Sequence, residues 1–354
     1  MEQPSTDVVI LNYNGKKYLS ECIDSVLRTD YPAYQVYVLD NASTEDDVEF
    51  LKTHYPQVKI IQNSSNNGYC AAYNLAFRTC KGKYFICLNN DVTVAADWIT
   101  HLVKLAESDE RIAAIQPKIV SYFDHSKFEY AGASGGMMDV YGYPFLRGRM
   151  FDTIEDDNGQ YNTVAEVFWT SGAAMFIRKD ALHVCGMLDE TIVHHMDEID
   201  LCWRMRMCGY KTLVEPRSVI HHIGGATIQT KSFRKIYWNH RNSVYIMLKN
   251  YELIHILWYV PVHLLLDYVV IAQSLLKGDI TTAGGVLKAH LWLLLNPLLI
   301  WKKRKEVQLL RTEDDNAVKR ILYPGSIVWE YFAGKRKTYT SLKKHTSHEY
   351  TPVA

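Results

Sequence analysis

Short apolar segments that each end in a polar cluster dominate the first quarter of this chain. The apolar segments cover residues 7–11, 36–39, 59–62 and 84–88, and stretches with the apolar spacing of a helix separate them. Strands that alternate with helices of about ten to fifteen residues indicate right-handed βαβ units and a parallel sheet. We therefore predict an α/β fold whose polar clusters gather at the sheet edge where open α/β proteins bind ligands.

The polar cluster Asn89-Asn90-Asp91 follows the fourth of these segments. A lone carboxylate at the end of a buried strand suits a hard divalent cation that also holds the phosphates of a substrate. The alternative is an ordinary Asn/Asp turn. Because three other polar clusters are expected at the same edge, Asp91 is a candidate metal ligand.

Two common nucleotide-binding fingerprints are missing from the sequence. Neither G-x-G-x-x-G nor G-x-x-x-x-G-K-[ST] follows the first apolar segment. Their absence argues against a dinucleotide-dependent dehydrogenase and against a P-loop NTPase. Asp40 follows the second segment, where a carboxylate can hydrogen-bond a ribose or a base.

A second group of acids lies further along the chain. Asp197, Glu198 and Asp200 place three carboxylates within four positions at the start of an expected helix. Carboxylates there also suit the helix dipole, so a structural role is the alternative. Arg204 lies four residues after Asp200 and can pair with it. This pairing favours Asp200 as the structural acid and Glu198 as a general base close to a metal-bound diphosphate.

Two other segments point to ligand binding. Residues 121–162 are rich in Gly, Tyr and Asp without clear periodicity, which is typical of a binding loop or a flap. His221 and His222 follow an apolar run and precede Gly224 and Gly225, which let the backbone approach a ligand closely. We expect one of the two histidines to join Asp91 on the cation.

Together these segments resemble family 2 glycosyltransferases with the GT-A fold, over about two thirds of the chain. The resemblance is greatest for bacterial rhamnosyltransferase-like members. It implies a Rossmann-like, mostly parallel sheet flanked by helices in residues 1–243, and a helical C-terminal region in residues 244–354. The segments that carry it are Val8–Asn14, Leu39–Ser43, Asn67–Asn74, Leu88–Asp91, Trp169–Ala173, Met196–Arg204 and His221–Gly225.

The resemblance also implies residue roles and a Mg²⁺ or Mn²⁺ cofactor. Asn89-Asn90-Asp91 carries one acid where the D-x-D motif of the family has two, and Glu198 stands where the family usually has Asp. The implied roles are a base at Glu198 with Asp197 as the fallback, metal binding by Asp91 and His221, a nucleotide pocket of Leu11, Asn12, Asn14, Asp40, Asn67, Asn74 and Asn90, and an acceptor border of Trp169, Ser171 and Gly172.

The implied activity is inverting transfer of a sugar from dTDP-rhamnose or a UDP-sugar. The acceptor would be a hydroxyl of a glycan or of a polyprenyl-linked intermediate in bacterial surface polysaccharide synthesis. A protein that binds sugar nucleotides or glycans without catalysis is the main alternative. A nucleotidyltransferase fits poorly, because residues 12–17 lack the Gly-rich first loop it needs. We expect no nucleic acid partner, and a homodimer stays open.

The C-terminal region suggests contact with a membrane. Residues 253–276 are apolar with a polar stripe at helical spacing, and Pro261 interrupts them, which favours an amphipathic helix. Trp301 precedes the basic run 302–305, as in an interfacial anchor, and residues 301–354 carry 12 Lys/Arg against 6 Asp/Glu, a charge of +6. Helices packed on the catalytic domain or on a second copy, and a true span, are the alternatives.

The expected location is the cytoplasm, peripheral on the inner face of the bacterial cell membrane. The 7 cysteines are odd in number and form no C-x-x-C pair, as expected for reduced, buried thiols. Residues 1–6 are short and polar, so we expect no signal peptide before the first strand.

Overall fold

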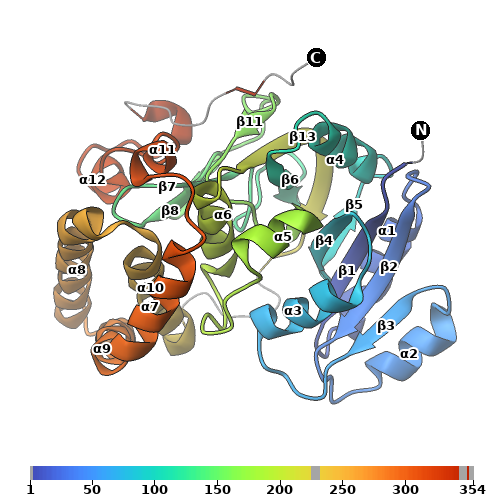
Figure 1. Ribbon diagram of the computed structural model, residues 1–354, viewed down its shortest axis with the longest axis horizontal. Helices are drawn as coiled ribbons and strands as arrows, with labels where there is room; N and C mark the ends of the chain where they lie inside the picture. Colours follow the sequence, from blue (N-terminus) through green and yellow to red (C-terminus); the bar gives the residue numbers. More distant parts are fainter. Residues whose placement is uncertain (1–2, 225–231, 343–348, 351–354) are drawn as a thin grey trace.

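A nine-stranded mixed sheet forms the centre of the computed structural model, which describes residues 3–224, 232–342 and 349–350 (Figure 1). Its strand order is β11-β13-β6-β12-β4-β1-β2-β3, and β5 pairs with β13. The strands are β1 (Thr6–Asn12), β2 (Tyr34–Asp40), β3 (Lys59–Gln62), β4 (Tyr84–Asn89), β5 (Val92–Val94), β6 (Ile112–Ser121), β11 (Ala165–Glu166), β12 (Ala174–Arg178) and β13 (Lys211–His222).

The parallel half of the sheet confirms the α/β prediction. β3, β2, β1 and β4 run parallel, and their carboxyl ends come together because Asn12 pairs with Asp40 and Leu11 pairs with Asn89. β12 runs antiparallel between β4 and β6, and β6 is parallel to β13. The polar clusters therefore meet at one edge, as the strand alternation predicts.

Helices cover both faces of this sheet and bury two separate apolar cores. α1 (Lys16–Leu27), α2 (Asp47–His54) and α4 (Trp98–Glu107) contribute to the core on one face. α3 (Tyr69–Thr79), α5 (Lys179–Cys185) and α6 (Asp197–Met207) contribute to the core on the other. Because strands β1 and β4 are buried on both faces, they read as continuous apolar runs rather than alternating ones.

Residues 121–162, expected to form a loop or flap, contain a small antiparallel sheet instead. Its order is β10-β9-β8-β7. The strands have two or three residues each, too few for a periodic pattern to show in the sequence. The buried Asp139 accepts hydrogen bonds from the backbone of Tyr141, Tyr143 and Ile327, which ties this segment to the C-terminal region. The strands are β7 (Gly136–Met138), β8 (Pro144–Leu146), β9 (Arg149–Met150) and β10 (Thr153–Ile154).

The C-terminal helices pack against the sheet domain through one continuous core, which includes Tyr245, Ile300 and Tyr323 together with residues of α3 and α6. α7, α8, α9 and α10 gather at one side of the molecule in Figure 1. The expected boundary after residue 243 lies inside α7. The helices are α7 (Phe233–Asn250), α8 (Leu253–Leu276), α9 (Ile280–Leu295), α10 (Pro297–Gln308), α11 (Asp315–Lys319) and α12 (Ile327–Phe332).

α8 buries its polar stripe and exposes its apolar side chains. His263, Asp267 and Ser274 are buried, whereas Trp258 is 69% exposed and Leu265 is 63% exposed. Among the described residues, α8 has the length and composition to cross a membrane, and the α9–α10 pair passes the same test only as a unit bent by 75°. The expected amphipathic helix is therefore present, with its polar side facing the protein.

Candidate active site

Two cavities meet at the carboxyl edge of the sheet. The smaller encloses about 310 Å³ and the larger about 660 Å³. Asp91 and Glu198 line both cavities, so the candidate metal ligand and the candidate base share one wall between two compartments. The other residues common to both are Asn89, Ala131 and His195.

Asp91 pairs with His222 rather than with His221. The Nε2 of His222 lies 3.2 Å from Oδ1 of Asp91, and its Nδ1 lies 3.0 Å from Oε2 of Glu129. His221 points elsewhere, and its ring lies 4.0 Å from that of His125. Adjacent residues of a strand face opposite sides, so only one of the two histidines can reach Asp91. The expectation for His221 is corrected accordingly, and Gly225 of the same motif lies outside the described residues.

The two carboxylates around His222 change its protonation. Burial alone would lower the pKa of His222, but the bonds to Asp91 and Glu129 outweigh it and raise that pKa to about 10. In the absence of a metal, the imidazolium compensates for the two buried acids. A carboxylate on Nδ1 with Nε2 directed at Asp91 is the arrangement that orients a histidine ligand toward a metal.

Glu198 and Asp197 lie at the first turn of α6, as the sequence predicts. The backbone enters this helix through two residues in the left-handed region, His195 at φ 65° and Met196 at φ 66°. Non-glycine residues adopt such angles only when the surrounding structure holds them there. After this entry, Glu198 lies on the wall shared by the two cavities and Asp197 lines the smaller cavity.

The environment of this turn favours protonated carboxyl groups. Burial raises the pKa of Glu198 and raises that of Asp197 further, because the two acids lie close together. A carboxyl with a raised pKa is a stronger base once ionised. The pair therefore has the chemistry of a general base whose reactivity is tuned by burial.

Arg241 and Asn242 hold the strained loop in place, a role that the sequence analysis does not assign. The Nδ2 of Asn242 donates to the carbonyls of His194 and His195, at 2.8 and 2.9 Å. Arg241 donates to Asn242 and to the carbonyl of Thr191. Both residues come from α7, so a C-terminal helix positions the loop that carries the candidate base.

Asp200 is structural, as its spacing to Arg204 suggests. The Nε of Arg204 lies 3.0 Å from Oδ2 of Asp200, and Lys249 lies 2.8 Å from its other oxygen. Burial opposes the charge, but Lys249 and Arg204 outweigh it and lower the pKa of Asp200. The surroundings of Asp197 and Glu198 thus favour the protonated form, whereas those of Asp200 favour the ionised form.

The smaller cavity contains part of the expected nucleotide pocket. Leu11 and Asn90 of that pocket line it, together with Ser171 and Gly172, which were expected at the acceptor border. Tyr69 donates from Oη to the carbonyl of Gly172. A Cβ on Gly172 would lie 2.8 Å from that hydroxyl, so this close approach requires glycine. The sequence analysis did not include the remaining polar and aromatic lining residues, which are Tyr13, Asn41, Asn66, Tyr69 and His194.

Other residues expected in the site support its walls from behind. Asn12 donates to Asp47 and accepts from Asn90, and Asp40 accepts from the backbone of Ser43. Asn74 bonds the backbone of Leu188 in both directions. The structure places these expected residues outside the two cavities that the described residues line: Asn12, Asn14, Asp40, Asn67, Asn74, Trp169 and His221.

The larger cavity takes part of its walls from the C-terminal helices, to which the sequence assigns no ligand-binding residue. Tyr130 and Arg149 come from residues 121–162, and Lys235, His240 and His263 come from α7 and α8. These segments are far apart in the chain, and only the packing of the C-terminal helices onto the small sheet brings them together. Residues 121–162 thus line the larger cavity, and short strands form part of the segment.

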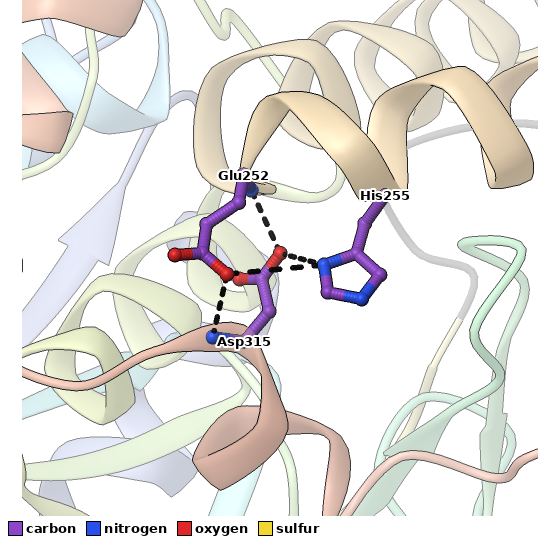
Figure 2. Close-up of side chains that lie close together, drawn as sticks. All are labelled: Glu252, His255 and Asp315. Atoms are coloured by element: carbon purple, nitrogen blue, oxygen red, sulfur yellow. Dashed lines mark hydrogen bonds and ion pairs between the residues drawn. The ribbon is translucent and has the colours of Figure 1, made fainter.

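A second cluster of possible metal ligands lies away from the cavities. Figure 2 shows Glu252, His255 and Asp315 turned toward one another at the starts of α8 and α11. The backbone of Glu252 donates to Asp315, and the backbone of Asp315 donates to Glu252. Arg311 pairs with Asp315 at 3.0 Å and Lys319 lies 2.7 Å from His255. These cations already neutralise the acids, so the cluster is a capped junction between two helices.

Comparisons with known proteins agree with this geometry. Residues 7–181 match the family model described as Glycosyl transferase family 2. The N-acetylglucosaminyl-diphospho-decaprenol L-rhamnosyltransferase of Mycobacterium tuberculosis is 26% identical over 68% of this chain and 83% of its own length. An uncharacterized glycosyltransferase of Haemophilus influenzae is 27% identical over 32% of the chain. The chain spans only 24% of the length of a Sinorhizobium fredii relative and 36% of the Haemophilus one.

Solved structures show the same fold at low identity. S. aureus TarS residues 1–349 in complex with UDP-GlcNAc aligns with 93% of this chain and 92% of its own, at a TM-score of 0.56 and 12% identity. GalNAc-T7 with UDP, GalNAc and Mn²⁺ aligns with 70% of this chain and 48% of its own, at a TM-score of 0.55 and 18% identity. Both are glycosyltransferases with the GT-A fold, which confirms the predicted architecture.

Proposed function

Since this chain belongs to glycosyl transferase family 2 through residues 7–181, we propose that it transfers a sugar from a nucleoside diphosphate sugar to an acceptor hydroxyl with inversion. One observation carries the proposal: Asp91 and Glu198 lie on the wall shared by the two cavities. A donor in the smaller cavity and an acceptor in the larger would then meet at a possible metal ligand and a possible base.

The donor is dTDP-rhamnose or a UDP-sugar. The smaller cavity offers Asn41, Asn66 and Asn90 for hydrogen bonds and Tyr13 and Tyr69 for contact with a flat base. The Mycobacterium tuberculosis relative is named as a rhamnosyltransferase, and the S. aureus neighbour was solved with UDP-GlcNAc. These names support a pyrimidine nucleotide donor for this chain.

Asp91 and His222 suit a Mg²⁺ or Mn²⁺ ion. Their ligand atoms lie 3.2 Å apart, which fits neighbouring ligands with metal bonds of about 2.0–2.2 Å. Glu129 on the far nitrogen would orient His222 once the ion replaces its Nε2 proton. A bound ion would neutralise charge on the departing nucleoside diphosphate. Mn²⁺ in the GalNAc-T7 structure supports this assignment.

Glu198 is the proposed base, with Asp197 as the alternative. Glu198 faces both cavities and its raised pKa matches a group that accepts a proton from a sugar hydroxyl. The hydroxyl oxygen attacks the anomeric carbon, the bond to the diphosphate breaks, and the proton passes to Glu198. Base assistance of this kind contributes roughly 10²–10⁴-fold to the rate. Trp169, Ser171 and Gly172 stay our proposed acceptor border, but Ser171 and Gly172 line the smaller cavity and Trp169 packs behind it with its Nε1 bonded to Met137. Ser171 and Gly172 would therefore contact the acceptor only where it meets the donor sugar.

The proposed acceptor is a glycan or a polyprenyl-linked intermediate of surface polysaccharide synthesis at the inner face of a bacterial membrane. α8 to α10 support membrane contact, because their outer faces carry exposed apolar residues and Lys302 and Lys305 are exposed beside Trp301. The relative from Mycobacterium tuberculosis is named for a decaprenol-linked acceptor. The exposed apolar residues are Leu253, Ile254, Leu257, Trp258, Leu265, Tyr268, Val269, Leu275, Leu276, Ile280, Leu287, Leu291, Leu294, Leu295, Leu298 and Trp301.

Release of nucleoside diphosphate from UDP- and dTDP-sugars, with Mg²⁺ or Mn²⁺ present, tests the proposal. The variants Glu198→Gln and Asp91→Ala are assayed beside the wild type, with and without polyprenyl-linked acceptors. Metal-dependent release that both substitutions abolish supports transfer and identifies the donor. Tight nucleotide-sugar binding without turnover under any of these conditions would instead identify a binding protein.

A further inference from the structure

Two cations lie on the face of one aromatic ring in the larger cavity. The guanidinium carbon of Arg149 is 3.8 Å from the centroid of the Tyr130 ring, and the Nζ of Lys235 is 5.7 Å from it. All three residues line the larger cavity, and none of them lines the smaller cavity. We call Tyr130, Arg149, Lys235 and His240 the cationic wall. Its charge faces the acceptor compartment rather than the nucleotide compartment.

Arg149 is half-buried and, unlike the buried Arg204 and Arg206, has no polar partner for its side chain among the described residues. Within the described part of the chain, its Nε is buried and makes no hydrogen bond, and no carboxylate lies within ion-pair distance. By contrast, Arg204 pairs with Asp200 and Arg206 pairs with Glu166. A buried donor without a partner is costly unless a ligand or water satisfies it. Arg149 is therefore positioned for a ligand.

Neighbouring groups on the same cavity are also unsatisfied. The Oη of Tyr143 and the Nε2 of His263 are buried without hydrogen-bond partners in the described residues, and their rings stack at 4.5 Å. His240 is held by a 2.7 Å bond from its Nδ1 to the buried Asp267, which also bonds His290. The carboxylate holds the Nδ1 proton of His240, so its Nε2 is left as an acceptor for a hydroxyl group of a ligand.

We propose that the cationic wall binds a phosphate or diphosphate group carried by the acceptor. This inference rests on the proposed transferase function and names the class of its acceptor. The cavity is also lined by Asp91, Glu129 and Glu198, but in the described part of the chain these acids form no ion pair with Arg149 or Lys235. A neutral sugar would therefore leave the two cations without a paired counter-charge. An oxyanion accepts from a guanidinium and an ammonium together.

The position of the cationic wall suits an acceptor at a membrane surface. His240 and His263 belong to α7 and α8, and the other side of α8 carries the exposed apolar residues. A lipid-linked diphosphate would place its charged group in the larger cavity while its chain follows the apolar helix face. The sugar attached to the diphosphate would then lie in the compartment that contains Glu198.

Calorimetric titration of the full chain tests this subsite, with UDP and Mn²⁺ at saturation so that the donor diphosphate position is filled. Three probes are compared: farnesyl diphosphate, neutral farnesol and inorganic pyrophosphate. We expect farnesyl diphosphate to bind much more tightly than farnesol, and Arg149→Gln to weaken it roughly 10- to 100-fold. Lys235→Gln should have a smaller effect in the same direction. UDP binding, measured first, tests the donor cavity separately.

Lys288→Gln is the matched control, because Lys288 also lies over aromatic rings, those of Phe233 and Tyr237, but lines neither cavity. Farnesyl diphosphate that binds more tightly than pyrophosphate indicates a lipid-linked acceptor, and equal affinities indicate a soluble phosphorylated one. Unchanged binding in folded Arg149→Gln, or a loss seen only when UDP is absent, would overturn the inference. Binding that persists in a protein without transferase activity would retain the subsite and reject the proposed function.

Discussion

α4 and α8 are both two-faced helices, but they bury opposite faces. α4 hides Trp98 and Leu102 against the sheet and exposes Lys104, as a helix in water does. α8 hides His263 and Asp267 and exposes Trp258 and Leu265. The exposed face of α4 is therefore polar, as expected for a surface in water. The exposed face of α8 is apolar, and its buried face carries polar residues. The candidate site lies where the two regions meet.

The largest expected effect is on the rate of sugar transfer and not on membrane binding. Glu198→Gln should lower the transfer rate roughly 10²–10⁴-fold, because the amide cannot accept the hydroxyl proton, while liposome binding stays unchanged. Since burial raises the pKa of Glu198, the wild-type rate should fall with acidification at a pH above that of an ordinary glutamate. Steady-state rates of the variant and the wild type between pH 5 and 8 measure the loss of rate and the pH dependence. Undiminished transfer by the variant would move the base to Asp197 or elsewhere.

The second prediction concerns the polar centre of the C-terminal helices. Asp267→Leu should destabilise the protein by about 3–5 kcal/mol, because His240 and His290 would lose their buried acceptor. Denaturant unfolding gives the free energy. Leu265→Asp on the exposed face of the same helix is the control and should change stability by about 0.5 kcal/mol or less. If Asp267→Leu stabilises the protein instead, then apolar residues are preferred on the buried face of α8, as they are on that of α4.

How far the sequence predicts this molecule depends on the range of each signal. Strand alternation identifies the parallel sheet, because this signal is local. The place of Asp91 after a strand and that of Glu198 at a helix start are also local signals, and both residues line the two cavities. The sequence does not show which of the two histidines contacts Asp91, because both follow the same apolar run. A bulge between Glu215 and Val219 also shifts the register of β13. Asn242 escapes it because its partners are backbone carbonyls 47 and 48 positions away.

The third prediction tests the link between the two regions. Asn242→Ala removes the hydrogen bonds to the carbonyls of His194 and His195, which lie at the start of the left-handed turn. We therefore expect kcat to fall roughly 10- to 100-fold with a smaller change in the KM for donor. Asn296→Ala, which removes a bond to the carbonyl of Trp292 within the C-terminal helices, is the control and should leave kcat intact. Equal losses in both variants would indicate a general effect on stability.

The fourth prediction examines the apolar exterior. Trp258→Glu should weaken binding to anionic liposomes roughly tenfold or more, because a fully buried large apolar side chain contributes about 1.5–3 kcal/mol. Phe123 is 76% exposed on the sheet domain, and Phe123→Glu should have no effect on liposome binding, measured by co-flotation with the liposomes. Sedimentation of the free protein checks the competing explanation. A dimer that Trp258→Glu dissociates, with liposome binding unchanged, would assign the α8 face to a second copy.

The smallest expected effect concerns the charges beside this exterior. Lys302 and Lys305 are exposed near Trp301, and a basic residue close to an anionic membrane contributes about 1 kcal/mol. Lys302→Gln with Lys305→Gln should therefore weaken binding to phosphatidylserine liposomes by roughly one order of magnitude at low salt and by much less at high salt. The same change at Lys81 and Lys104, exposed on the sheet domain, should have no such effect. Equal losses from both pairs would mean that net charge, rather than the C-terminal face, drives attraction, and α8 would then contribute apolar area without orienting the protein.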